Sequence, residues 1–165
     1  MNHETQIKNA KTIADIFEIV KDIVKEYMNL EQAGLMVGMT DLGEFSRGFV
    51  GAFYSPEANT IIINKRPLSK LLNTNPQLYN YYIFHIILHE YIHSIGAYNE
   101  TQARQLVFEI SQHYFGNKHI VTQLTTNIEK FMPNFVYPDE GFKSPHDVNI
   151  EFVKGIDIKN TNYIN

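Results

Sequence analysis

Residues 75–96 read NPQLYNYYIFHIILHEYIHSIG, and this stretch carries the strongest structural signal in the chain. Asn75 is suited to cap a helix, Pro76 to occupy its first position and Gly96 to end it. Apolar side chains fall on nearly every side of the predicted helix, so we expect it to lie in the interior. Polar side chains on a buried helix need partners, and this helix carries His85, His89, Glu90 and His93.

The pentad His89-Glu90-Tyr91-Ile92-His93 is an HExxH motif. Histidines four residues apart lie one turn apart on the same face of a helix, where both can bind one tetrahedral ion. The adjacent glutamate can take a proton from a water that zinc activates and pass it to a leaving amine. Chance matches to the motif occur, but burying these groups without a metal would leave several polar atoms unpartnered. We therefore predict that His89 and His93 bind zinc and that Glu90 is the catalytic base.

A zinc site of this kind needs a third protein ligand, and the next helix, predicted over 100–115, supplies candidates. Glu100 lies in its first turn, just after the chain reverses, which returns it to the side of His93. A glutamate there is also favoured by the helix dipole alone. His113 lies as close to the inner face of this predicted helix as Glu100 does, but it is three turns nearer the C-terminal end. His85 lies one turn before His89 on the preceding helix. Glu100 is the predicted ligand, with His113 and His85 as alternatives.

The rest of the sequence predicts an α+β fold with a small sheet. Thr12 and Asp15 can form a capping box for an N-terminal helix. The segments 48–54 and 60–64 flank a turn and predict a β-hairpin. We treat 1–133 as one domain, 65–75 as a loop and 134–165 as an extension. The expected elements are helices over 12–30, 75–96, 100–115 and 118–132, and strands over 35–39, 48–54, 60–64 and 148–153.

Composition narrows the partners that we expect. The chain has 165 residues, 44% of them hydrophobic, a formal net charge of -4 and no cysteine. Disulfides and thiolate metal sites are therefore excluded. Without a basic run, neither nucleic acid nor a membrane is an expected partner. The first residues are polar and lack the apolar stretch of a secretory signal, so a cytoplasmic protein is expected. The sequence does not predict an oligomeric state.

These features resemble the zincin metallopeptidases, and among them the minimal soluble gluzincins. The resemblance covers about 48–115: a strand-turn-strand segment, the HExxH helix, and a helix that begins Asn99-Glu100-Thr101-Gln102-Ala103. It implies Zn²⁺ bound by His89, His93 and Glu100. It also implies a cleft between the 60–64 strand and the HExxH helix, where a substrate peptide pairs with the strand. Metzincin or rRNA-maturation spacing would put the third ligand at Asn99, a poor zinc ligand.

Further residues have less specific patterns. Tyr98, between the two ligand-bearing helices, is a candidate catalytic residue that would donate a hydrogen bond to the oxyanion of the tetrahedral intermediate; the alternative is a loop tyrosine with no catalytic role. His85 is expected either to contact and support a zinc ligand or to pack in the core. Arg104 is expected either to be a surface residue or to pair with a carboxylate. The extension is expected to be a structural addition to the domain. The alternative hypothesis is that it covers the cleft and holds the enzyme latent, because it carries the metal-capable residues Asp139, Glu140, His146 and Asp147.

The sequence therefore predicts a zinc endopeptidase that cleaves peptides or unfolded protein segments. One alternative is a zinc-bound interaction or regulatory protein on the same scaffold, with little turnover. Another is a zinc hydrolase with a non-peptide substrate, although the acidic balance disfavours nucleic acid.

Overall fold

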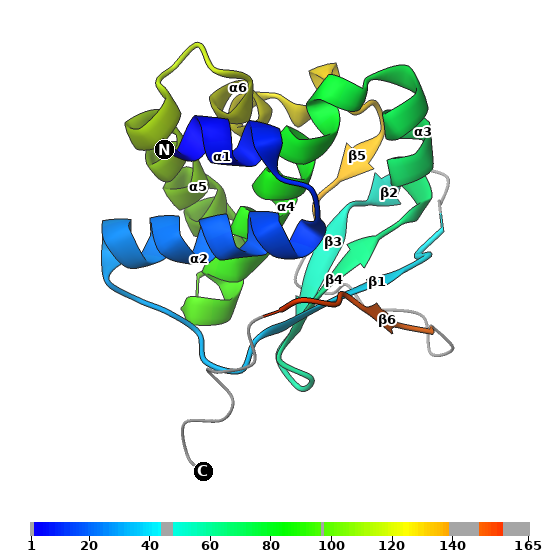
Figure 1. Cartoon of the computed structure of the whole chain (residues 1–165), viewed down its shortest axis with the longest axis horizontal. Coiled ribbons are helices and arrows are strands. Elements are labelled where there is room, and N and C mark those ends of the chain that lie inside the picture. Colours follow the sequence, from blue (N-terminus) through cyan, green and yellow to red (C-terminus); the bar gives the residue numbers. More distant parts are fainter. Residues whose placement is uncertain (1, 44–47, 97, 139–148, 157–165) are drawn as a thin grey trace.

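The computed structural model describes residues 2–43, 48–96, 98–138 and 149–156. Within them the chain forms six α-helices, a short 3₁₀ helix and two small sheets, so the expected α+β class is confirmed (Figure 1). The helices are α1 (His3–Asn9), α2 (Ile13–Met28), α3 (Arg66–Thr74), α4 (Pro76–Ile95), α5 (Glu100–Phe115) and α6 (Ile120–Thr126), followed by η1 (Ile128–Lys130). The strands are β1 (Met36–Thr40), β2 (Phe49–Val50), β3 (Ala52–Ser55), β4 (Thr60–Asn64), β5 (Phe135–Val136) and β6 (Glu151–Phe152).

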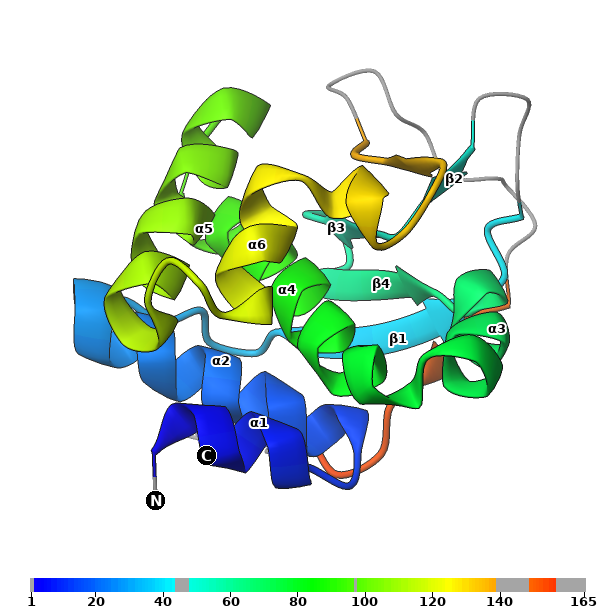
Figure 2. The same ribbon diagram turned by 90° about the horizontal axis from the view of Figure 1, so that it is seen from above.

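Helix α4 is the centre of the molecule, as its apolar sequence predicts. It packs against helices α1, α2, α3, α5 and α6 and against strands β3 and β4. Figure 2 shows α1 and α2 on one side of it and α5 and α6 on the other. Asn75 occupies the N-cap position, but its side chain makes no capping hydrogen bond. The buried residues of α4 are Leu78, Tyr82, Ile83, Phe84, His85, Ile86, Ile87, Leu88, His89, Glu90, Tyr91 and Ile92.

The four-stranded sheet has the order β3-β4-β1-β6. Strands β3 and β4 form the expected antiparallel hairpin, with Tyr54 opposite Ile61, and β1 runs parallel to β4. Strand β4 is therefore interior, and the strand at the edge of the sheet beside α4 is β3. The expectation that the 60–64 strand borders the cleft was wrong, because both of its backbone edges are paired within the sheet.

The predicted strand over 48–54 is divided at Gly51. Its first part, β2, pairs in parallel with β5, and its second part, β3, joins the main sheet. A Cβ atom at Gly51 would lie 2.4 Å from the ring of Phe135 and 2.7 Å from the hydroxyl of Tyr82. The glycine therefore permits the close approach of β5 and α4 at the point where the chain changes sheets.

Three other expectations are corrected. Residues 66–74 form helix α3 instead of a loop, with Leu68 and Leu71 buried one turn apart. The helix expected over 118–132 ends at Thr126 and is followed by η1. The strand expected over 148–153 is reduced to β6, which pairs with β1, and Val148 lies outside the described residues.

A short helix, α1, precedes the expected N-terminal helix, whose capping box of Thr12 and Asp15 is confirmed.

The extension is continuous with the core where it is described. Phe135 is buried in the main hydrophobic cluster, and β5 pairs with β2. Asp139, Glu140, His146 and Asp147 lie outside the described residues, so the idea that they cover the cleft stays a prediction.

No helix in the described parts of the chain is long and apolar enough to cross a membrane.

The side chain of buried Asn64, at the end of β4, hydrogen-bonds to four backbone groups. Its side-chain oxygen accepts from the backbone N–H groups of Leu42 and Arg66, at 3.0 and 3.1 Å. Its amide donates to the carbonyl oxygens of Val50, at 2.9 Å, and Gly43, at 3.3 Å. Removing this side chain would leave several of these groups without partners.

We expect Asn64→Ala to lower the free energy of unfolding by about 3 kcal/mol, because buried polar groups lose their partners. Urea denaturation checks this. Asn73→Ala is the matched control, since Asn73 is exposed on α3, and should change the free energy by less than about 0.5 kcal/mol. Equal, small effects of both substitutions would contradict the structural role of Asn64.

Candidate metal centre

Helix α4 places the two motif histidines together near its C-terminal end. The ring centroids of His89 and His93 are 5.0 Å apart, as expected for residues one turn apart on one helical face. His89 is buried, with 1% of its surface exposed, and His93 is half-buried. The buried position of His89 follows from the apolar residues on both sides of it along α4.

Helix α5 brings Glu100 to these histidines. The helix begins at Glu100 and is capped by Asn99, whose side chain accepts from the backbone N–H of Gln102 in a complete capping box. Glu100 Oε1 lies 2.7 Å from His89 Nε2, and Glu100 Oε2 lies 3.1 Å from His93 Nε2. Candidate ligand atoms of all three residues lie within 4.8 Å of one another. The described residues contain no other such group of three or more His, Asp or Glu side chains.

His93 Nε2 and Glu100 Oε2 are hydrogen-bonded, but the orientation of His89 and Glu100 fits a shared ion better than a hydrogen-bonded pair. His89 Nε2 and Glu100 Oε1 are close, yet neither has a hydrogen-bond partner in the described structure. Two buried polar atoms held together without an aligned hydrogen bond are costly unless a third group satisfies both. Two imidazoles and one carboxylate form a donor set that zinc accepts, with a fourth position left for water or substrate.

The electrostatics favour, for His89 and Glu100, the protonation states that metal binding requires. Burial lowers the pKa of His89 and outweighs the opposing effect of the Glu100 carboxylate. Burial raises the pKa of Glu100, but its contacts with His89 and His93 dominate and lower it to about 2. A neutral imidazole and an ionised carboxylate are the forms that bind a divalent cation.

Glu90 lies beside this group without belonging to it. Its Oε2 is 4.0 Å from His89 Nε2, and the residue is 4% exposed. Burial, followed by the negative charge of Glu100, raises its pKa well above the ordinary value, while a hydrogen bond from the Tyr54 backbone opposes the rise. A divalent cation nearby would favour the ionised form. A buried carboxyl of this kind, anchored by strand β3, is suited to exchange protons in a cleft.

A cavity of about 500 Å³ opens beside these residues. The edge strand β3 contributes Phe53 and Tyr54 to its lining, and α4 contributes Glu90 and His93. Its remaining lining residues include Tyr98, Glu100 and Pro138. The described structure thus places a sheet edge, a buried carboxyl and two of the three candidate ligands, His93 and Glu100, around one opening.

Tyr98 lines this cavity, which is a position that its expected role as a donor to the oxyanion requires. It packs closely over Gly96, where an added Cβ would lie 2.4 Å from the tyrosine ring. The glycine that ends α4 therefore also makes room for Tyr98. Whether the hydroxyl donates to a reacting substrate stays a prediction.

The two alternative third ligands lie elsewhere. His113 is exposed at the far end of α5, and its ring packs against Tyr27 and Tyr114. His85 is buried behind His89, with its Nε2 2.9 Å from the hydroxyl of Tyr137. Burial lowers the pKa of His85 to about 3, so its ring is neutral. The geometry therefore favours Glu100 over both histidines.

Tyr137 is the neighbour of the site that the sequence did not indicate. Its ring centroid lies 4.8 Å from that of His89, and the Arg104 guanidinium lies 4.7 Å from the same tyrosine ring. Arg104, whose surface position is confirmed, thus contacts an aromatic ring instead of a carboxylate. A lone tyrosine after a two-residue strand has no periodic pattern, so only the tertiary structure could place it against His89.

We expect Tyr137→Phe to lower the free energy of unfolding by about 1–2 kcal/mol, because buried His85 Nε2 loses its partner. Zinc affinity should change by less than about tenfold, since the ring that packs on His89 remains. Thermal unfolding and a zinc competition titration check the two effects. The control is Tyr79→Phe on α4, because the described structure gives the Tyr79 hydroxyl no hydrogen bond. A large zinc loss in Tyr137→Phe would contradict this role.

Comparisons with protein-family models, curated proteins and solved structures find no match to this chain.

Proposed function

We propose that the protein is a zinc-dependent metallopeptidase of the zincin class, with a gluzincin-like ligand set. The observation that carries the proposal is the convergence of His89, His93 and Glu100 beside the buried carboxyl of Glu90. Helix dipole preference explains a glutamate at the start of α5. It does not explain why both carboxylate oxygens face the two motif histidines.

The residues have separate roles in the proposed reaction. His89, His93 and Glu100 would hold Zn²⁺, which lowers the pKa of a water molecule and polarises the scissile carbonyl. Glu90 would take the proton of that water and deliver it to the leaving amine. The Tyr54 backbone N–H holds the Glu90 carboxyl in place. Tyr98 would donate a hydrogen bond to the developing oxyanion.

The proposed substrate is an extended peptide or an unfolded protein segment. Strand β3 is an edge strand beside α4, and its residues line the same cavity as Glu90. An extended peptide can hydrogen-bond to such an edge, which would lay its backbone across the ligand set. A folded protein segment would not fit this arrangement, because its backbone groups are already paired.

The test is hydrolysis of an unbiased peptide library by the zinc-loaded protein, with cleavage detected by mass spectrometry. Cleavage that chelation abolishes and zinc restores is the expected result. Bound zinc without any cleavage would instead support the alternative, a zinc-bound interaction protein on this scaffold.

A further inference from the structure

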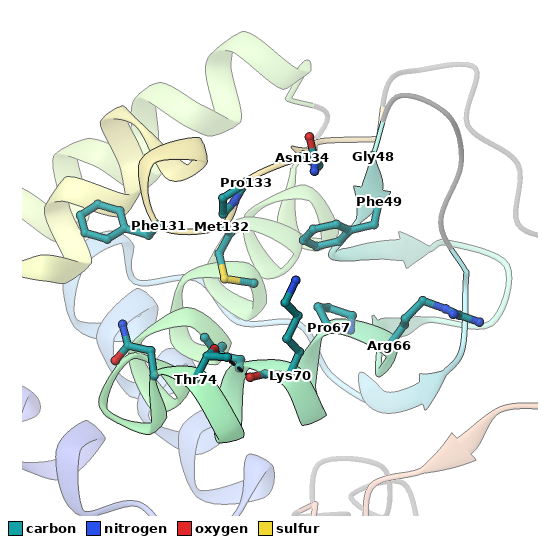
Figure 3. Close-up of a pocket in the computed structure, with 12 residues that line it drawn as sticks. Gly48, Phe49, Arg66, Pro67, Lys70, Thr74, Phe131, Met132, Pro133 and Asn134 are labelled. Atoms are coloured by element: carbon teal, nitrogen blue, oxygen red, sulfur yellow. Dashed lines mark hydrogen bonds between the residues drawn. The ribbon is translucent and has the colours of Figure 1, made fainter.

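A second pocket lies apart from the candidate metal centre. It has a volume of about 360 Å³ and lies between helix α3 and the segments that flank β2 and β5 (Figure 3). None of the candidate ligands lines it. Its size is at the lower end of the range for small-molecule sites in proteins.

One part of the pocket is apolar. Phe49, Leu71 and Met132 line it, and each of them is buried, with 8%, 4% and 6% of its surface exposed. Pro67 and Pro133 add rigid apolar surface. Because Phe49, Leu71 and Met132 keep little exposed surface, most of the apolar area open to a ligand belongs to Pro67, Phe131 and Pro133. An apolar ligand would release water from this area, which favours binding by about 25 cal/mol per Å² of surface covered.

The pocket also has an exposed cation, Lys70, that forms no ion pair with any described residue. Figure 3 shows the Lys70 side chain extending from α3 into the opening, between Phe49 and Met132 in this view. No carboxylate of the described residues lies within ion-pair distance of its amine, and no described acidic residue lines the pocket. Arg66 is the other cationic residue among the lining residues, and its side chain points away from the opening. It donates two hydrogen bonds, each 2.9 Å long, to the carboxylate of Asp41.

A neutral donor accompanies the lysine. Asn75 lines the same pocket, and its side chain makes no hydrogen bond in the described structure, although the residue stands at the N-cap of α4. The Thr74 hydroxyl is already engaged, because it donates to the Lys70 backbone oxygen at 2.8 Å. Among the described lining residues, Lys70, Asn75 and Asn134 therefore have side-chain donors available to an incoming acceptor.

We propose that this pocket binds a small organic carboxylate with an apolar body. The carboxylate would accept from Lys70 and Asn75, and the body would cover Phe49, Leu71 and Met132. A free amino acid fits less well, because no described acidic group is present to hold its ammonium. A polyphosphate fits less well, because one available cation offsets one charge and the apolar walls would stay uncovered.

The probes are octanoate and 4-phenylbutyrate, titrated into the protein and followed by ¹H–¹⁵N NMR. Shifts should concentrate at Phe49, Leu71 and Met132. The uncharged amides of both acids should bind about tenfold more weakly or worse, because the charge-assisted bond to Lys70 is lost. Acetate should also bind far more weakly, because it has no apolar body to cover the pocket wall.

Three variants and one control distinguish binding in this pocket from binding at the metal centre or at the general surface. Lys70→Gln should weaken octanoate binding about tenfold or more, whereas Lys70→Arg should largely preserve it. Lys65→Gln is the matched control, because it removes the same charge beside the same helix from a residue that does not line the pocket. Glu100→Ala should leave the affinity unchanged, since a carboxylate bound at a zinc ion would depend on Glu100 instead.

Several results would overturn the proposal: no binding at millimolar probe, equal binding of acid and amide, or equal affinity in wild type and Lys70→Gln. Shifts centred on His93 and lost in Glu100→Ala would place the probe at the metal centre and would also overturn it. The outcome is independent of peptidase activity, because none of these readouts requires turnover.

Discussion

Glu90→Gln should abolish peptide hydrolysis while leaving zinc bound. The substitution keeps the size of the side chain but removes the group that accepts the proton from water. A positioned general base contributes about 10²–10⁴-fold to the rate, so kcat/KM should fall by that factor. Zinc content should be unchanged, because Glu90 is not one of the three convergent ligands.

The measurement is kcat/KM on the best peptide from the library, with zinc quantified in the same samples. Glu109→Gln is the matched control, because it removes the same charge from an exposed position on α5. It should retain wild-type activity. If Glu90→Gln keeps more than about a tenth of the activity, Glu90 is not the base, and the proposed mechanism fails even if zinc is present.

Glu100→Ala should remove zinc from the protein. Its two carboxylate oxygens contact both motif histidines, so its loss leaves a two-histidine site. The fall in zinc affinity should exceed the roughly 10–100-fold typical of residues that only support a ligand. A competition titration with a chromophoric chelator measures it.

Thermal unfolding gives a second readout of the same variant. Zinc binds the folded wild type and should raise its Tm, because a ligand specific for the native state stabilises that state. The rise should vanish in Glu100→Ala and persist in Glu109→Ala. Unchanged zinc affinity in Glu100→Ala would move the third ligand to another residue and remove the basis for a gluzincin-like site.

The strongest local patterns in the sequence predicted their elements correctly. The unbroken apolar run around His89 predicted the buried helix α4. The capping pair Thr12–Asp15 lies at the start of α2. The first-turn position after the chain reversal also located Glu100, which begins α5, beside His93. Each of these signals is contained within a few neighbouring residues, so no tertiary information was needed.

The features that were missed depend on contacts between distant segments. Strand β5 is two residues long, which is too short to show alternation. That β3 and not β4 lies at the sheet edge follows from the pairing of β1 with β4, which neither strand reveals alone. Tyr137 reaches His89 only because β5 pairs with β2 across the core.

Helix α3 is a different case, because its sequence contains a helical pattern although a loop was predicted. Leu68 and Leu71 are three residues apart, and Pro67 lies in the first turn, where proline is tolerated. The segment is short and rich in polar residues, which favoured a loop. In the structure these two leucines are buried, and the helix packs against α4.

The most direct test of the central claim is the metal content of the purified wild-type protein, measured by inductively coupled plasma mass spectrometry. The proposed centre predicts one zinc per chain, either as purified or after zinc addition and removal of the unbound excess. Protein that holds no zinc after this treatment would contradict the claim. The convergence of His89, His93 and Glu100 would then be a hydrogen-bonded cluster, and the proposed peptidase activity would lose its basis.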